Sequence, residues 1–505
     1  MGVKGLRKEQ KKYIVMLDQT KYPNTLGKLK KTEYKSRSIK EELRENLISA
    51  MKLKKRVFEG IYGYENSVIP DLERAILSKH NINLLGLRGQ AKTRLARLMI
   101  GLLDEYTPYL LGTDLCEDPL NPISSEGIRI VNEEGDKAEI GWIHRSERYF
   151  EKLATPDVSV ADLIGDVDPI KAANLKLSYS DERVIHFGMV PRANRSLFVI
   201  NELPDLQARI QVALFNILQE GDIQIRGFKL RLPVDIQFIF TANPEDYTNR
   251  GSIVTPLKDR IGSQIITHYP EELVTALKIT QQEARISVAQ RNSIFLPSAA
   301  AELLEQISFE ARKSEWVDAK SGVSARLSVS AMENLYSAAE RRMLLNNEEK
   351  TEIRLTDFIG IIPSIIGKVE LVYEGEQEGA ATVAENLIGS AIKTKITDYL
   401  PALDKIKNTT VDNPYQGLMN WFSEGNKIDL LYDMSDEEFT ERVAACKPLI
   451  QLVSNSRKTK KENAYFVMEM ALWGMSEYAK INRDKLVDGL QFSDLFGAYM
   501  GGITN

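Results

Sequence analysis

The segment of residues 86–93, GLRGQAKT, constrains the fold of this chain more than any other feature. It follows a brief apolar run at residues 81–85, which predicts a strand, and precedes an apolar-faced stretch at residues 94–103, which predicts a helix. A strand that enters a helix through a glycine-rich loop is the context in which backbone N–H groups bind phosphate groups. We therefore predict an α/β fold with a phosphate loop at these residues.

Each part of this loop suits one role in binding a nucleoside triphosphate. Glycines let the backbone wrap the phosphates, the Lys92 ammonium reaches the β- and γ-phosphates, and the Thr93 hydroxyl ligates Mg²⁺. Ala91 stands where the general pattern has glycine. Its methyl group narrows the backbone angles but removes no N–H donor, so we expect it to be tolerated. The predicted nucleotide-binding residues of the loop are Gly86, Gly89, Gln90, Ala91, Lys92 and Thr93.

Two later apolar runs end in polar side chains that fit the chemistry of hydrolysis. Residues 196–202, SLFVINE, predict a strand followed by Asn201 and Glu202. Phosphate-loop enzymes use an acidic residue to hold the metal and a further group to polarise the attacking water, and Glu202 suits the second task. Asn201 stands where an aspartate is expected. It keeps an acceptor oxygen but lacks the charge, so we expect Asn201→Asp to lower the Mg²⁺ requirement. Residues 236–243 predict another strand, which ends at Asn243, a candidate to orient the water.

Arg260 and Arg326 are candidates to stabilise the charge that develops on the transferred phosphoryl group. Arg260 lies in PLKDRIG, residues 256–262, and Arg326 lies in SARL, residues 324–327. A lone arginine most often forms a surface ion pair. Their order after the loop and the polar strand ends is what favours a catalytic role.

Short apolar runs separated by helical segments predict a parallel sheet of the α/β class. The predicted strands are residues 81–85, 150–154, 196–200, 236–241 and 264–268. A hairpin is predicted at residues 128–143, turning at Glu134-Gly135. From residue 271 onward the periodicity is helical, and residues 373–379, YEGEQEG, predict a linker between two helical regions.

Charge is unevenly distributed, although the net charge of the 505 residues is only −5. Residues 1–56 carry an excess of about eleven positive charges, which predicts a solvated helical arm or, as the alternative, an arm that contacts nucleic acid or an acidic partner. Cys116 and Cys446 are too far apart in the sequence for a disulfide framework or metal-ligand spacing, which argues against a structural zinc site. The sequence has no uninterrupted apolar run of about 18 residues, so we expect a cytoplasmic chain with no membrane span.

These motifs occur in an order that resembles the AAA+ superfamily of ATPases, and more narrowly the magnesium-chelatase ATPase subunit and the MoxR-type ATPases. The resemblance begins at residues 61–65, IYGYE, and continues through the phosphate loop and residues 154–168. It is most specific at residues 188–202 and extends to about residue 370. Residues 1–57 and 375–505 resemble nothing in this family.

The resemblance also implies roles for individual residues. Ile61 and Tyr62 would flank the adenine, Asn243 would end the sensor-one strand, Arg260 would be the arginine finger and Arg326 the second sensor. The catalytic set that it implies is Lys92, Glu202, Asn243, Arg260 and Arg326, and the metal-binding set is Thr93 and Asn201.

The domain plan that follows has four parts. These are a basic helical arm at residues 1–57, an AAA+ ATPase core at 58–272, a helical lid at 273–372 and an all-α C-terminal domain at 373–505. The implied cofactors are ATP and Mg²⁺.

The implied assembly is a homo-oligomeric ring, expected to be a hexamer, that remodels a partner with a von Willebrand-type metal-binding domain; a nucleic-acid partner is not expected. Three alternatives stay open: the ATPase subunit of a true magnesium chelatase, a nucleic-acid motor or transcription activator, and a nucleotide-gated scaffold that does not hydrolyse ATP. The activator form needs a GAFTGA-type loop, which this sequence lacks. The scaffold follows from the missing charge at Asn201.

Overall fold

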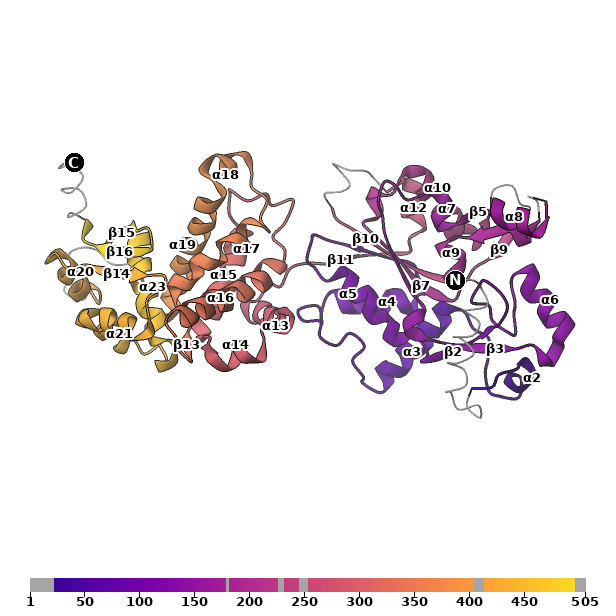
Figure 1. Cartoon of the computed structure of the whole chain (residues 1–505), viewed down its shortest axis with the longest axis horizontal. Coiled ribbons are helices and arrows are strands. Elements are labelled where there is room, and N and C mark those ends of the chain that lie inside the picture. Colours follow the sequence, from indigo (N-terminus) through magenta and orange to yellow (C-terminus); the bar gives the residue numbers. More distant parts are fainter. Residues whose placement is uncertain (1–21, 179–180, 226–230, 245–252, 404–412, 496–505) are drawn as a thin grey trace. The chain divides into compact units, whose positions relative to one another are not determined.

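The computed structural model describes residues 22–178, 181–225, 231–244, 253–403 and 413–495. The chain divides into two compact units, Met1–His268 and Tyr269–Asn505, and each is described by itself (Figure 1). The first unit contains a parallel sheet with helices on both faces. The second unit is mainly helical. Among the described residues, no helix is long and apolar enough to cross a membrane.

A five-stranded parallel sheet forms the centre of the first unit. Its strands, in spatial order, are β11 (Ser263–Ile266), β1 (Ile82–Leu85), β10 (Ile236–Ala242), β7 (Ser196–Asn201) and β4 (Tyr149–Leu153). Numbered by their order in the chain, these five strands are arranged 5-1-4-3-2. Each pair of neighbours is parallel, so every connection must cross over one face of the sheet. The predicted α/β class and all five predicted strands are confirmed.

Side chains alternate between the two faces of this sheet, and both faces are buried. Leu197, Val199 and Ile239 pack with one set of helices, whereas Phe198 and Phe238 pack with another. The first set comprises α3 (Ile39–Lys52), α4 (Val68–Leu77) and α5 (Lys92–Leu98). The second comprises α7 (Val160–Leu163), α9 (Met189–Arg192), α10 (Ala208–Glu220) and α12 (Thr255–Arg260) (Figure 1). Burial on both faces explains why the strands read as continuous apolar runs.

The described part of the first unit also contains three antiparallel pairs and three further α-helices. The pairs are β2 (Tyr106–Leu110) with β3 (Ile140–His144), β5 (Gly165–Val167) with β6 (Ile185–Phe187), and β8 (Asp222–Gln224) with β9 (Arg231–Pro233). The helices are α2 (Leu26–Leu29), α6 (Ser125–Glu134) and α8 (Pro169–Leu175).

The hairpin predicted at residues 128–143 is wrong. Residues 125–134 form α6 instead, where the Ser124 hydroxyl accepts a hydrogen bond from Gly127 N and caps the helix. The helix ends at Glu134, and Gly135, with a φ of +56°, is its C-cap. The strand that follows, β3, pairs with β2 from earlier in the chain, a long-range pairing that local turn signals do not report.

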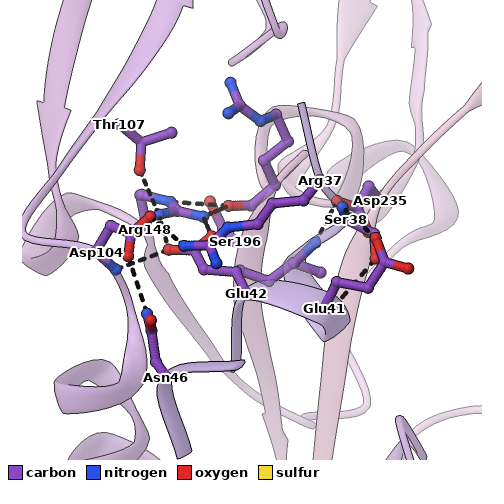
Figure 2. A network of polar contacts seen from close by, with 12 residues as sticks. Arg37, Ser38, Glu41, Glu42, Asn46, Asp104, Thr107, Arg148, Ser196 and Asp235 are labelled. Atoms are coloured by element: carbon purple, nitrogen blue, oxygen red, sulfur yellow. Dashed lines mark hydrogen bonds and ion pairs between the residues drawn. The ribbon is translucent and has the colours of Figure 1, made fainter. Parts of the chain in front are cut away.

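The basic N-terminal region is not a solvated arm where the structure describes it. Helix α3 buries Ile39, Leu43 and Leu47 in the core beside the sheet. It also contributes Glu42, whose carboxylate forms two hydrogen bonds, of 2.8 and 2.6 Å, with the Arg148 guanidinium (Figure 2). The exposed fractions of these two side chains are 5% and 0%, so α3 is an integral part of the core. Residues 1–21 of the predicted arm lie outside the described residues.

Further hydrogen bonds satisfy this buried ion pair. Arg148 also donates to Thr107 Oγ1 at 2.6 Å and to the Arg195 carbonyl at 2.7 Å. Glu42 accepts from Asp104 N at 2.7 Å (Figure 2). A buried charge is costly unless its polar atoms are paired, and here both charges are paired. The network joins α3 to β2 and to the residues that directly precede β4 and β7.

The second unit is helical, as predicted, but it is not all-α. Its helices are α13 (Leu273–Glu283), α14 (Val288–Ser293), α15 (Ser298–Ala311), α16 (Arg326–Leu345), α17 (Ile362–Ile366), α18 (Tyr373–Glu378), α19 (Ala380–Tyr399), α20 (Gln416–Ser423), α21 (Asp436–Ala445), α22 (Lys447–Ser454) and α23 (Ala464–Glu477). Strands β14 (Ile428–Leu431), β16 (Gly489–Ser493) and β15 (Asn482–Lys485) form an antiparallel sheet, and β12 (Ile294–Phe295) pairs with β13 (Thr351–Glu352).

The predicted linker at residues 373–379 is also corrected by the structure. Residues 373–378 form α18, and Gly379, with a φ of +94°, separates it from α19. One hydrophobic cluster includes buried side chains from Ala284 to Phe492. The proposed boundary at residue 373 therefore separates two parts of one described core rather than two cores.

We expect Glu42→Ala to lower the free energy of unfolding by about 3–5 kcal/mol, because it leaves the buried Arg148 charge unpaired. Urea denaturation of the full chain, followed by circular dichroism, measures this. The control is Glu45→Ala on the same helix, which removes an exposed ion pair with Arg37 and should cost no more than about 1 kcal/mol. Equal effects of the two substitutions would contradict the role given to the buried pair.

Candidate functional site

The glycine-rich loop connects β1 to α5, in the strand–loop–helix context that the sequence predicts. Gly89 has a φ of +73°, and Ala91, directly before the helix, has a φ of +56°. A left-handed conformation costs an L-residue about 1–2 kcal/mol. The position where the general pattern has glycine is thus one that favours glycine, and this chain holds an alanine in that conformation.

The beginning of the loop is held by close contacts with β10 and with the residue after β11. Gly86 N donates to the Ala242 carbonyl at 3.1 Å. The Thr267 hydroxyl donates to Gln90 Oε1 at 2.7 Å, and both of these atoms face Gly86. A Cβ atom on Gly86 would lie 2.0 Å from Thr267 Oγ1 and 2.2 Å from Gln90 Oε1, so only glycine fits. The Gln90 side chain is therefore engaged in shaping the loop.

The segment predicted to flank the adenine lies against the same loop. The Tyr64 hydroxyl is 3.0 Å from the Gln90 carbonyl and 2.7 Å from the His268 carbonyl. Ile61 is buried in the core cluster beside α3 and α4, and Tyr62 is partly exposed. The structure thus places residues 61–65 next to the loop, and the adenine contact of Ile61 and Tyr62 stays a prediction.

Lys92 and Asn243 are brought together, as their predicted roles require. The Lys92 ammonium donates to Asn243 Oδ1 at 2.7 Å and to the Leu87 carbonyl at 2.9 Å, and it also bonds the Gly86 carbonyl. Asn243 directly follows β10, the strand that pairs with β1. The cation and the amide therefore lie at the same edge of the sheet, at the carboxyl ends of neighbouring strands.

A second group of side chains lies one strand further along. The Asn201 amide oxygen accepts from the Thr241 hydroxyl at 3.1 Å and lies 3.4 Å from the Thr93 hydroxyl. Glu202 follows with a φ of +57°, and its backbone N–H donates to Thr241 Oγ1 at 3.2 Å. This left-handed residue directly follows β7, which ends at Asn201.

The amide nitrogen of Asn201 has a partner that the sequence did not reveal. It donates to Glu151 Oε1 at 2.7 Å, and Glu151 belongs to β4, the edge strand. The other oxygen, Glu151 Oε2, accepts from Arg97 Nη2 at 2.8 Å and from the Tyr149 hydroxyl at 3.1 Å. Burial, followed by the charge of Glu151, raises the pKa of Tyr149, so its hydroxyl remains a donor.

The two candidate arginines are not among these contacts. Arg260, at the end of α12, forms an ion pair with Asp259, and its guanidinium lies 5.6 Å from the centre of the Phe215 ring. Arg326 belongs to the second unit, where it begins α16 and its backbone N–H donates to Ser324 Oγ at 3.1 Å. Their roles as arginine finger and second sensor stay predictions.

Sequence reasoning missed four residues that shape the site: Tyr64, Glu151, Thr241 and Thr267. One signal was available for Glu151, because a charged residue inside an apolar run marks a place where a strand meets a polar partner. The others carry no such signal, since threonine and tyrosine are ordinary strand residues.

A cavity of about 700 Å³ lies elsewhere in the first unit, between the start of α6 and β6. Charged side chains that line it pair with one another, as Arg129 does with Glu126 at 2.7 Å and Arg183 with Asp181 at 2.7 Å. It is not lined by the phosphate loop.

Comparison with known proteins supports the class of this fold. Residues 175–263 match the family described as the sigma-54 interaction domain. A crystal structure of NtrX from Brucella abortus in complex with ADP is 12% identical, over 70% of this chain and 67% of that chain, with a TM-score of 0.37. The RuvB Holliday junction branch migration motor of Thermotoga maritima is 12% identical, over 71% and 74%, with a TM-score of 0.31. No curated protein matches the chain.

The matched stretch contains β7, β10 and α12, so it includes the strand ends that carry Asn201, Glu202 and Asn243. The same parallel sheet also contains β1, which is followed by the glycine-rich loop. The fold is an α/β core with a five-stranded parallel sheet, followed by a mainly helical region.

We expect Gly86→Ala to destabilise the first unit and to abolish nucleotide binding, because the new methyl group would overlap Thr267 and Gln90. Thermal unfolding and binding of a fluorescent ADP analogue measure the two effects. The control is Gly101→Ala, at a position where an added Cβ meets no atom within 4 Å, and it should change neither. Normal binding by Gly86→Ala would show that the loop does not hold the nucleotide in this way.

Proposed function

We propose that this protein is a Mg-ATP-dependent AAA+ ATPase. One observation carries the proposal: Lys92, Asn243, Thr93 and Asn201 meet at the carboxyl ends of three adjacent parallel strands, β1, β10 and β7. The phosphate loop and the first turn of α5 lie at the same edge. Open α/β sheets bind their ligands at this edge.

Each residue has a task that follows from its chemistry and place. The Lys92 ammonium exchanges its carbonyl and amide partners for the β- and γ-phosphate oxygens, while Asn243 stays beside it to orient the attacking water. Glu202 accepts a proton from that water. The backbone N–H groups of the loop, at the start of α5, stabilise the phosphate charge.

The residues present also fit Mg²⁺. The Thr93 hydroxyl and the Asn201 amide oxygen are neutral oxygen donors 3.4 Å apart, and Mg²⁺ binds oxygen ligands. These two residues would hold the metal, which neutralises the charge of the β- and γ-phosphates when it is bound.

The finer assignment is a MoxR-type or magnesium-chelatase-like ATPase that works in a ring, expected to be a hexamer. Its support is the ordered series of motifs from residue 61 to Arg326. The partner that this assignment implies carries a von Willebrand-type metal-binding domain, and hydrolysis would remodel that partner. The ATPase subunit of a true magnesium chelatase differs only in the downstream task; binding of a porphyrin by the partner complex would favour it.

A second candidate is a transcription activator, because residues 175–263 match the sigma-54 interaction domain. The lack of a GAFTGA-type loop argues against it, and so does the packing of α3 from the basic region into the core. Binding to a labelled DNA duplex separates the candidates: sequence-specific binding would favour the activator. A nucleotide-gated scaffold would bind ATP without steady-state hydrolysis.

Two substitutions test the site directly. We expect Lys92→Ala to abolish nucleotide binding or turnover, and Glu202→Gln to keep ATP binding while slowing hydrolysis about 10²–10⁴-fold, the scale of losing a general base. Calorimetric titration with ATP and a phosphate-release assay measure the two steps. Asp205→Asn, the same change of charge three residues away, should retain both. Near-normal hydrolysis by either of the first two variants would remove that residue from its proposed role.

In a ring, we expect each ATP site to be completed by Arg260 of the neighbouring subunit, and mixing two variants tests this. We expect Arg260→Ala to bind ATP normally and to lose about 10³–10⁵-fold in hydrolysis, the scale of losing an arginine finger. Mixed with Lys92→Ala subunits, whose Arg260 is intact, it should regain part of the activity, because some interfaces then contain a complete site. Mixtures that co-assemble but stay inactive would mean that Arg260 acts within its own subunit.

A further inference from the structure

Glu151 is a carboxylate that lies against the amide standing in place of the expected aspartate. Glu151 Oε1 accepts from Asn201 Nδ2 at 2.7 Å. The exposed fraction of the Glu151 side chain is 24%, so the contact is largely shielded from water. A hydrogen bond to an ionised group is stronger than one between neutral groups, and burial strengthens it further.

The face of the sheet explains why these groups meet. One face of the sheet packs against α3, α4 and α5 through residues such as Val199 and Ile239. By the strand register, this same face carries Tyr149, Glu151, Asn201 and Thr241. Thr93 and Arg97 lie four residues apart on α5, on one side of that helix. Thr93 meets Asn201, and one turn later Arg97 meets Glu151.

This carboxylate fixes the orientation of the Asn201 amide. An ionised carboxylate only accepts hydrogen bonds, so it must face the NH₂ group. The amide oxygen then points the other way, towards the hydroxyls of Thr93 and Thr241. Without Glu151, a flipped amide would present its NH₂ group to Thr93, and a donor cannot ligate a cation.

Glu151 also supplies a negative charge at the place where Asn201 lacks one. Phosphate-loop enzymes hold Mg²⁺ with the loop hydroxyl and a nearby acidic residue. Here the acidic residue is on the adjacent strand, where it accepts a hydrogen bond from the NH₂ group of the same amide. Such outer partners set the orientation of metal ligands and their affinity for the metal.

We propose that Glu151 is a positioning residue, which turns the Asn201 oxygen towards the metal position and provides the charge that the amide lacks. The metal part of this role rests on the proposed Mg-ATP function, whereas the orientation of the amide does not.

The pair allows a charge swap that separates this role from ordinary packing. Asn201→Asp alone would place two carboxylates within 2.7 Å of each other, where like charges repel and the hydrogen bond is lost. Adding Glu151→Gln restores a donor and an acceptor, with the amide and the carboxylate exchanged between the two strands. The double variant has the net charge of the native pair.

The first measurement is thermal unfolding of the nucleotide-free protein. We expect Asn201→Asp to lower the unfolding midpoint and the double variant, Asn201→Asp with Glu151→Gln, to recover most of the loss. The effects of the two substitutions on stability are then strongly non-additive, as expected for residues in contact. Additive effects, or Asn201→Asp as stable as the native protein, would overturn the proposal.

The second measurement is the affinity for ADP by calorimetry, in Mg²⁺ and in EDTA. The dissociation constant in EDTA divided by the dissociation constant in Mg²⁺ gives the contribution of the metal to the affinity. We expect Glu151→Gln to lower that ratio about 10–100-fold, the usual effect of losing an outer partner of a metal ligand, and the double variant to restore it. An unchanged ratio in Glu151→Gln would refute the metal role.

Arg97→Ala is the matched control, since it removes the ion pair of Glu151 and leaves its contact with Asn201 intact. The Arg97 side chain is 61% exposed, so the substitution should change the unfolding midpoint little. It should also leave the ratio of the dissociation constants in EDTA and in Mg²⁺ undiminished. If the native protein binds no ADP in either buffer, the proposed function fails, while the unfolding measurements still decide whether Glu151 orients Asn201.

Discussion

The parallel pairing of β1, β10 and β7 is the constraint on which the candidate site depends. In this register Leu85 lies opposite Ala242, and Phe240 lies opposite Ile200. The residues that follow these strands must therefore leave the sheet at the same edge. The phosphate loop, Asn243 and Asn201 come from three distant parts of the chain, and it is the sheet that places them side by side. The buried phenylalanines of one face and the aliphatic side chains of the other hold that register.

Much of this arrangement could be predicted from the sequence, because its signals are local. Each strand of the main sheet is a short apolar run bounded by polar residues, and the glycine spacing of residues 86–93 is a property of consecutive positions. Since both faces of the sheet are buried, these runs contrast clearly with the amphipathic helices between them. The positions of Asn201 and Asn243 at strand ends follow directly from the strand boundaries, and the position of Lys92 at the start of α5 follows from the spacing of the loop.

The parts that could not be predicted depend on contacts between distant residues. Glu42 reads as one more charge on a polar helix, and only its burial against Arg148 shows that α3 belongs to the core. The signals around Gly135 fit a helix stop as well as a strand turn, and the choice is made by the pairing of β3 with β2. In the small sheet, β14 pairs with β16 from about 60 residues later in the chain, and β15 and β16 form a local hairpin within a stretch whose periodicity is helical.

The same limitation changes how Asn201 is understood. From the sequence alone, Asn201 stands where an aspartate is expected, and Asn201→Asp should help to bind the metal. In the structure the adjacent strand already carries a carboxylate, so an aspartate there would face Glu151. The register explains the choice of side chain on β4: Asn201 lies opposite Leu153, so residue 151 is a diagonal neighbour two positions back along its strand. The extra methylene of glutamate lets its carboxylate reach along the strand to the amide, and an aspartate at that position would fall short. The charge and the ligand oxygen, which usually belong to one side chain, can thus be divided between two neighbouring strands when a hydrogen bond holds them together.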